Sequence, residues 1–191
     1  MLEFRIVVLA TLGIGAYGSH SILMVRHDFL RIGRLSPFMN SIVWLSYAGY
    51  VGVILYTVWK GYWLFPDTLK GTTPGGLVLF IAGVVVIGLG IRRAGVLYDM
   101  LGRTADVPIR DGIYRWSRNP QFVGWVLALV GLGVIARSGL ALLQVGLFAA
   151  MLHGYVVYVK EPYLLQSLNT QFETYMDETP RYVGLPDRCD R

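Results

Sequence analysis

The sequence is poor in charged residues and in cysteine. Only 15% of its 191 residues are charged and 54% are hydrophobic, a balance that excludes an ordinary soluble domain. The one cysteine, Cys189, is third from the end, so an intrachain disulfide and a paired-cysteine metal site are excluded. Zinc-peptidase motifs, phosphate-binding loops and serine elbows are missing too. Because His20 and His153 stand isolated in apolar segments, we predict no metal site.

Long apolar segments are present instead. Five of them are separated by more polar connections, at 6–25, 41–58, 75–91, 122–136 and 139–159. Most are close to the roughly 20 residues that a transmembrane helix needs. The first segment is followed by arginines rather than by a cleavage site, so we interpret it as a retained helix and not as a signal peptide. The pattern predicts an all-α protein, a polytopic membrane helical bundle of about five transmembrane helices.

The organisation that follows is a single membrane domain over 1–191. Residues 1–91 hold the first three helices, and residues 92–191 hold the last two helices and a C-terminal cap. Only "ARSG" separates the last two apolar segments. A connection this short predicts an antiparallel helical hairpin.

Basic residues are distributed unevenly between the two sides of this predicted bundle. The connections after the first and third helices, together with the C-terminal segment, hold 13 of the 17 lysines and arginines, which leaves 4 (Arg5, Lys60, Lys70 and Arg137) for the other side. The positive-inside rule then predicts an integral membrane protein with its N-terminus outside and its C-terminus in the cytoplasm. We relate the net charge of +5 to topology and anionic lipids, and expect no nucleic-acid partner. No feature indicates a protein partner.

One glycine pattern resembles a dinucleotide-binding motif without its context. Gly13, Gly15 and Gly18 fit G-x-G-x-x-G, but they lie inside an apolar helix with no preceding strand. Close packing between helices is the better interpretation.

Polar residues return where the last two predicted helices reach the cytoplasmic side. In "YRWSRNP", Asn119 is predicted as a helix N-cap and Pro120 as the first helical residue. Because the hairpin is short, Arg118 at the start of one helix lies level with Glu161 at the end of the other, and the two can share a pocket. The alternative is that Glu161 is an interfacial carboxylate paired with Lys160 or Arg118.

Two ordered motifs flank this hairpin. "DGIYRWSRNPQFVGWVL" resembles the pattern G-x-Y-x-x-x-R-H-P-x-Y-x-G, and "KEPYLLQSLNTQFETYMDETPRY" resembles E-E-x-x-L followed by F-G-x-x-Y-x-x-Y and P-R. Both patterns belong to the isoprenylcysteine carboxyl methyltransferase and phospholipid methyltransferase group of integral membrane enzymes. The resemblance covers about 98–186. The matching positions are Gly112, Tyr114, Arg118, Pro120, Gly124, Glu161, Leu165, Tyr175, Pro180 and Arg181.

The sequence departs from the family patterns at several positions. Asn119 stands where the family has His, and an amide side chain cannot carry charge. Pro162 replaces the second Glu. The other departures are Phe122 for Tyr, Leu168 and Asn169 for Phe-Gly, and Phe172 for the first of the two later tyrosines.

The resemblance implies a methyltransferase that uses S-adenosylmethionine, bound at the cytosolic ends of the last helices beneath the C-terminal cap. It implies catalytic roles for Arg118, Asn119 and Glu161. The residues expected to bind the cofactor are Tyr114, Arg118, Asn119, Pro120, Gly124, Tyr158, Glu161 and Arg181. Arg118 suits the cofactor's carboxylate, Glu161 its ammonium or ribose, and Arg181 can bring the C-terminal segment over the site by pairing with Glu161.

The methyl acceptor implied by the resemblance is a lipidic or other hydrophobic small molecule. It reaches the site from the bilayer, so membrane lipids are expected partners. Methyl transfer from a sulfonium requires alignment and a site poor in water, but no metal. Two other functions stay open at this stage. One is an NADPH-dependent membrane reductase of the sterol or steroid type, with arginines on the phosphates. The other is a catalytically inactive membrane scaffold.

Overall fold

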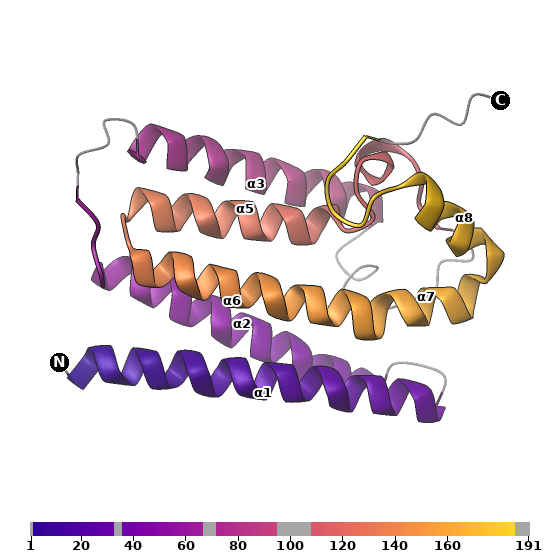
Figure 1. Ribbon diagram of the computed structural model, residues 1–191, viewed down its shortest axis with the longest axis horizontal. Helices are drawn as coiled ribbons and strands as arrows, with labels where there is room; N and C mark the ends of the chain where they lie inside the picture. Colours follow the sequence, from indigo (N-terminus) through magenta and orange to yellow (C-terminus); the bar gives the residue numbers. More distant parts are fainter. Residues whose placement is uncertain (1, 33–35, 67–71, 95–107, 186–191) are drawn as a thin grey trace.

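The apolar segments fold into long helices that lie side by side. The computed structural model describes residues 2–32, 36–66, 72–94 and 108–185. Its elements, in chain order, are α1 (Leu2–Ile32), α2 (Pro37–Lys60), α3 (Thr72–Ala94), the 3₁₀ turn η1 (Gly112–Arg115), α5 (Pro120–Ile135), α6 (Gly139–Tyr155), the π-turn η2 (Val156–Lys160), α7 (Glu161–Leu168) and α8 (Thr170–Glu178) (Figure 1). Within those ranges the only β pairing is an isolated bridge between Leu64 and Ser138. The predicted all-α fold is confirmed.

Among the described residues, four helices are long and apolar enough to cross a membrane: α1, α2, α3 and the continuous helix from Gly139 to Leu168. The fourth predicted segment, 122–136, forms the shorter helix α5, which has 16 residues. At about 1.5 Å per residue, α5 is roughly 24 Å long, somewhat less than the ~30 Å of a hydrocarbon core. Helix α1 extends past the predicted 6–25 at both ends, because Arg5 and Arg26 end an apolar run without ending a helix.

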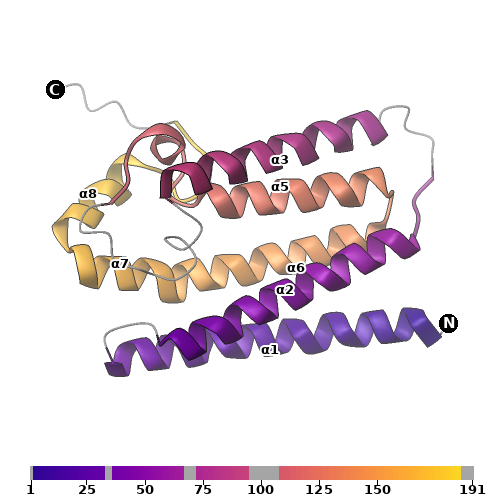
Figure 2. The same cartoon turned by 180° about the vertical axis from the view of Figure 1, so that it is seen from behind.

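The two sequence motifs meet at one end of the bundle. The N-terminus of α1 lies at the opposite end, with the connections 61–66 and 136–138 (Figures 1 and 2). We call the end of the bundle away from this N-terminus the site end. It contains the end of α3, the start of α5, and the helices α7 and α8. The predicted hairpin is confirmed: Ser138 caps α6 by accepting a hydrogen bond from the Ala141 amide at 3.3 Å. Helices α7 and α8 form the predicted C-terminal cap.

The orientation of the bundle is open to a direct test. The basic residues Arg34, Lys70, Arg103, Arg188 and Arg191 lie outside the described residues, but the count that includes them predicts that the site end faces the cytoplasm. A reporter fused to the C-terminus is therefore expected to be active only in the cytoplasm, and an N-terminal tag to be accessible only from outside. Paired fusions to a cytoplasmic and an exported reporter make the measurement. A C-terminus reached only from outside contradicts the prediction.

Helices α3 and α5 pack through facing glycines. A Cβ atom added to Gly83 would overlap the Ala128 amide nitrogen and lie 2.6 Å from the Gly124 carbonyl oxygen, and one added to Gly131 would lie 2.6 Å from the Gly76 carbonyl oxygen. On each helix the two glycines are seven residues apart, so the close approach recurs after two turns. Such contacts let the backbones approach in the way small residues do at membrane helix interfaces. They fix the start of α5, and with it Asn119, against the end of α3.

The N-terminal glycine pattern is also a packing feature in part. Gly13, Gly15 and Gly18 lie within α1. A Cβ added to Gly18 would overlap the Met151 side chain of α6, and one added to Gly15 would lie 3.6 Å from the Tyr50 ring of α2. Gly13 has open space around its Cβ position. The interpretation as close helix packing is confirmed for Gly18, and it does not apply to Gly13.

Candidate functional site

The site is assembled by backbone contacts between two segments far apart in the sequence. The Arg118 amide donates to the Pro180 carbonyl at 3.0 Å, and the Gly184 amide donates to the Trp116 carbonyl at 3.3 Å. We call residues 180–184 the strap. The Tyr175 hydroxyl of α8 also donates to the Tyr114 carbonyl at 2.8 Å. These contacts hold the C-terminal cap and the strap against the segment that precedes α5.

A local change of helix type sets the direction in which the Lys160 and Glu161 side chains point. Helix α6 continues into the π-turn η2, where the Glu161 amide donates to the Val156 carbonyl five residues earlier. Pro162 follows as an early residue of α7. A proline ring clashes with the carbonyl four residues before it in a regular α-helix, and a π-turn relieves such a clash by adding a residue to the turn. This gives Pro162, a departure from the family pattern, a structural role.

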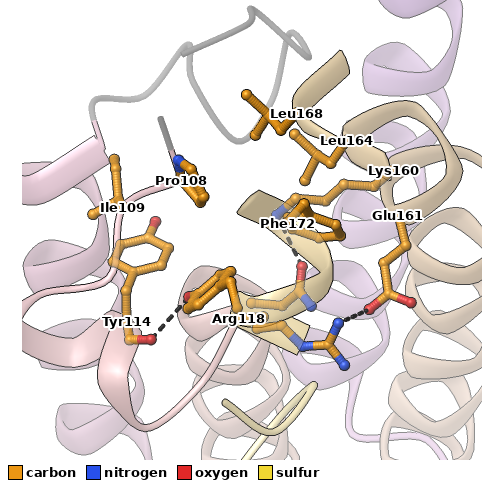
Figure 3. A pocket seen from close by; sticks show the side chains of 11 residues that line it. Pro108, Ile109, Tyr114, Arg118, Lys160, Glu161, Leu164, Leu168 and Phe172 are labelled. Carbon is orange, nitrogen blue, oxygen red and sulfur yellow. Dashed lines mark hydrogen bonds and ion pairs between the residues drawn. The ribbon is translucent and has the colours of Figure 1, made fainter. Parts of the chain in front are cut away.

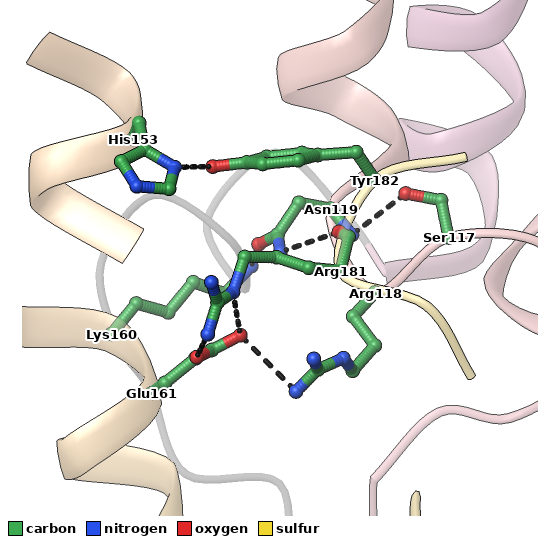
Figure 4. A network of polar contacts seen from close by, with 8 residues as sticks. All are labelled: Ser117, Arg118, Asn119, His153, Lys160, Glu161, Arg181 and Tyr182. Atoms are coloured by element: carbon green, nitrogen blue, oxygen red, sulfur yellow. Dashed lines mark hydrogen bonds and ion pairs between the residues drawn. The ribbon is translucent and has the colours of Figure 1, made fainter. Parts of the chain in front are cut away.

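Two arginines converge on the buried carboxylate of Glu161 (Figure 4). Arg181 donates from Nε to Oε1 at 3.0 Å and from Nη2 to Oε2 at 2.7 Å, a two-pronged contact. Arg118 Nη1 lies 3.1 Å from Oε1. The hydrogen bond to Glu161 raises the pKa of Arg181, whereas burial lowers the pKa of Arg118 despite the nearby carboxylate. The expected pairing of Arg181 with Glu161 is confirmed, and so is the proximity of Arg118 to Glu161.

Arg118 retains donor capacity. Its side chain is only 9% exposed. Within the described ranges, neither Nε nor Nη1 makes a hydrogen bond, and the Nη1 contact with Glu161 is an ion pair without hydrogen-bond alignment. Buried donors without an acceptor cost free energy, and the cost falls when an acceptor binds. Arg118 is therefore suited to receive an anionic group.

Asn119 does not act as the predicted side-chain cap. It occupies the N-cap position of α5 but makes no capping hydrogen bond. Its amide instead joins two other parts of the site: Oδ1 accepts from Lys160 Nζ at 2.8 Å, and Nδ2 donates to the Arg181 carbonyl at 3.0 Å. The predicted N-cap position is confirmed, but the side chain does not cap the helix, because Lys160 of η2 and the strap compete for it.

Replacement of Asn119 by alanine is expected to loosen the strap. Both contacts are lost, and the Asn119 side chain is almost fully buried. We expect the loss of these two hydrogen bonds to lower the unfolding free energy by roughly 1–3 kcal/mol. The measurement is the thermal midpoint in detergent, with Gln166→Ala, an exposed amide on α7, as the control. Equal midpoints for the two variants would contradict the bridging role of Asn119.

A narrow pocket lies among these residues (Figure 3). Its empty space, counted to the open mouth, is about 410 Å³, but only about 30 Å³ lies far enough from every atom to hold the centre of a water molecule. The pocket is therefore open at its mouth but narrow inside. The residues that line it are Pro108, Ile109, Tyr114, Arg118, Asn119, Lys160, Glu161, Leu164, Leu168, Phe172 and Tyr175.

The structure brings together part of the predicted set. Tyr114, Arg118, Asn119 and Glu161 line the pocket, and Arg181 reaches it through Glu161. Lys160 and Phe172 also line the pocket, although neither was predicted as a site residue. Their positions in the second motif could have indicated such a role, because Lys160 is one residue before Glu161 and Phe172 is three residues before Tyr175.

Three predicted cofactor residues lie elsewhere. Gly124 packs against the backbone of Gly83 in α3, and Pro120 is buried at the first turn of α5. Tyr158 of η2 is half exposed and lies beneath Arg26 of α1, on the side of the helix that faces α1. None of the three lines the pocket.

His153 of α6 contacts the strap through a hydrogen bond. Its Nδ1 lies 2.8 Å from the Tyr182 hydroxyl, and burial raises the pKa of that hydroxyl. His153 is two turns before Glu161 and is not among the lining residues. His153 therefore makes a hydrogen bond to the strap and does not face the pocket.

Comparison with known proteins places the site in a family context. The profile of the phospholipid methyltransferase family matches residues 72–171, just over half of the chain. A protein-S-isoprenylcysteine O-methyltransferase of Tribolium castaneum is 28% identical over 115 residues, which cover 58% of this chain and 40% of the relative. The chain thus aligns with less than half of that relative's length. No solved structure gives a significant match. The family match runs from α3 to the start of α8, so Phe172, Tyr175 and the strap lie beyond it.

Proposed function

Because the chain belongs to the phospholipid methyltransferase family, we propose that it is a membrane methyltransferase that uses S-adenosylmethionine and methylates a lipidic or membrane-partitioned acceptor. The observation that carries the proposal is the pair of unsatisfied, buried Arg118 donors beside Glu161. The four apolar helices agree with an acceptor that reaches the site from the bilayer.

The side chains of the pocket fit the cofactor group by group. Arg118 presents two buried donors, Nε and Nη1, either of which can donate to a carboxylate oxygen. Glu161 presents the only carboxylate among the described lining residues, for an ammonium or for ribose hydroxyls. Tyr114, Phe172 and Tyr175 offer ring faces for a flat base or for a sulfonium.

The protein's own contribution to the reaction is binding, alignment and the exclusion of water. S-adenosylmethionine, when bound, supplies a methyl group that its sulfonium already activates for in-line displacement. Leu164, Leu168 and Phe172 form an apolar wall that keeps water from the reacting atoms. We assign Glu161 a binding role, because its carboxylate is held by two guanidinium groups. With a void this small, the Glu161–Arg181 contact and the apolar wall must shift when a ligand enters.

Calorimetry in detergent tests the proposal. We expect S-adenosylhomocysteine to bind the purified full chain and NADPH not to bind. Binding of NADPH alone would identify a reductase, and binding of neither would identify a scaffold. The acceptor class is tested by incubating membrane lipid extracts with radiolabelled S-adenosylmethionine and identifying the labelled product by mass spectrometry. A labelled product that partitions into water would contradict a lipidic acceptor.

A further inference from the structure

A groove runs between α1 and α6 on the flank that carries Tyr158, outside the methyl-transfer pocket. It encloses about 1100 Å³, counted to its open side. Its walls hold the small residues Gly15, Ala16 and Ser19 of α1, and Ala150 and Gly154 of α6. Small side chains keep the two helices from filling the space between them. The groove is therefore an open trough. Two of the residues that line it, Leu12 and Leu23, are exposed and apolar, as expected of a surface that faces lipid.

The length of the trough matches one leaflet. Along α1 it is lined from Thr11 to Leu23, a rise of about 18 Å at ~1.5 Å per residue. Half of a hydrocarbon core measures roughly 15 Å. A transmembrane helix of a second copy would contact a groove along the whole core, about 30 Å. An acyl chain of one leaflet needs only the length observed.

A cation lies at the mouth of the trough, toward the site end. The Arg26 guanidinium lies 5.8 Å from the ring centre of Tyr158, a residue of the trough wall. Arg26 is exposed and follows Leu23, the last lining residue of α1, by about one turn. Asp28 is two residues further on, which places it on nearly the opposite face of the helix. The mouth thus presents a positive charge where lipid headgroups lie.

We propose that this trough binds an anionic phospholipid of the leaflet at the site end. One acyl chain lies between α1 and α6 over the small residues, and the phosphate contacts Arg26, which Tyr158 holds in place through its ring face. The proposal does not depend on the methyltransferase assignment, because neither Arg26 nor Tyr158 lines the methyl-transfer pocket. It also gives Tyr158 a role that differs from the predicted contact with the cofactor.

Native mass spectrometry of the full chain in detergent tests the site. Phosphatidylglycerol and phosphatidylcholine with identical acyl chains are added at equal concentration, and the retained adducts are counted. Wild type is expected to retain more phosphatidylglycerol. Arg26→Gln is expected to reduce that preference roughly fivefold, the worth of one basic residue at a membrane surface. The matched control is Arg31→Gln, which replaces another exposed arginine, in the last turn of α1. This variant is expected to keep the wild-type preference for phosphatidylglycerol.

A second pair of variants tests the trough itself. Ala150→Phe fills the trough from an exposed position and is expected to lower retention of both lipids. Gly88→Phe adds the same ring to α3, where the Cβ position has open space, and leaves retention unchanged. Thermal midpoints establish that each variant is folded. Wild-type lipid preference in Arg26→Gln would overturn the headgroup contact. Wild-type retention in Ala150→Phe, with or without a change of oligomeric state, would overturn the lipid assignment.

Discussion

Arg118→Ala is expected to weaken S-adenosylhomocysteine binding roughly ten- to hundredfold, about 1.5–3 kcal/mol, the scale of a lost charged hydrogen bond. The substitution removes the buried donors that we assign to the ligand carboxylate. It leaves Glu161 paired with Arg181, so no buried carboxylate is left without a partner and the protein is expected to fold. Calorimetry in detergent gives the affinity, and the thermal midpoint confirms folding.

Arg115→Ala is the matched control. Arg115 is exposed, lies three residues away at the end of η1 and does not line the pocket, so its loss is expected to change binding little. Glu161→Gln is a less specific probe, because it leaves Arg118 and Arg181 together without a carboxylate and mixes loss of binding with loss of stability. If Arg118→Ala and Arg115→Ala bind the ligand equally well as folded proteins, the pocket assignment is wrong.

Gly83→Ala is expected to destabilise the bundle by roughly 1–3 kcal/mol or more, the usual cost of overpacking. The added Cβ meets the backbone of α5 at Ala128 and Gly124, and backbone atoms cannot rotate away as a side chain does. Helices α3 and α5 must then separate, and the start of α5 shifts with them. The thermal midpoint measures the loss of stability, and weaker ligand binding at a temperature well below that midpoint measures the shift of the site.

Gly88→Ala provides the control on the same helix. Its Cβ position has open space, so alanine is expected to stabilise the helix slightly, by about 0.5–1 kcal/mol from the higher helix propensity. A fall in the midpoint of similar size in both variants would show that the facing glycines do not determine the packing of α3 on α5.

Several features of the site followed from sequence patterns alone. Pro120 begins α5 as predicted, because a proline at the first helical position loses no hydrogen bond. Arg118 and Glu161 meet because a three-residue connection forces α5 and α6 to run antiparallel with their site ends level. The motif ending in Pro-Arg indicated that Arg181 returns to Glu161, and it does.

Side-chain directions did not follow from the sequence. The direction of the Asn119 side chain depends on Lys160 and the Arg181 carbonyl, and these approach it only once η2 and the strap are packed. Tyr158 was predicted beside the cofactor, three residues before Glu161. The π-turn between Tyr155 and Glu161 changes the angle between neighbouring residues, and its position has no clear sequence pattern.

Segment length, hairpin length and helix-start residues act locally, so they were enough to predict a helical membrane protein that brings two polar motifs to one end. Which face of each helix is buried depends instead on how the helices pack against one another. In a bilayer both the lipid-facing and the packed faces are apolar, so periodicity does not separate them. For this reason the sequence did not show that Gly124 packs against α3, or that Tyr158 lies beside the trough and not in the pocket.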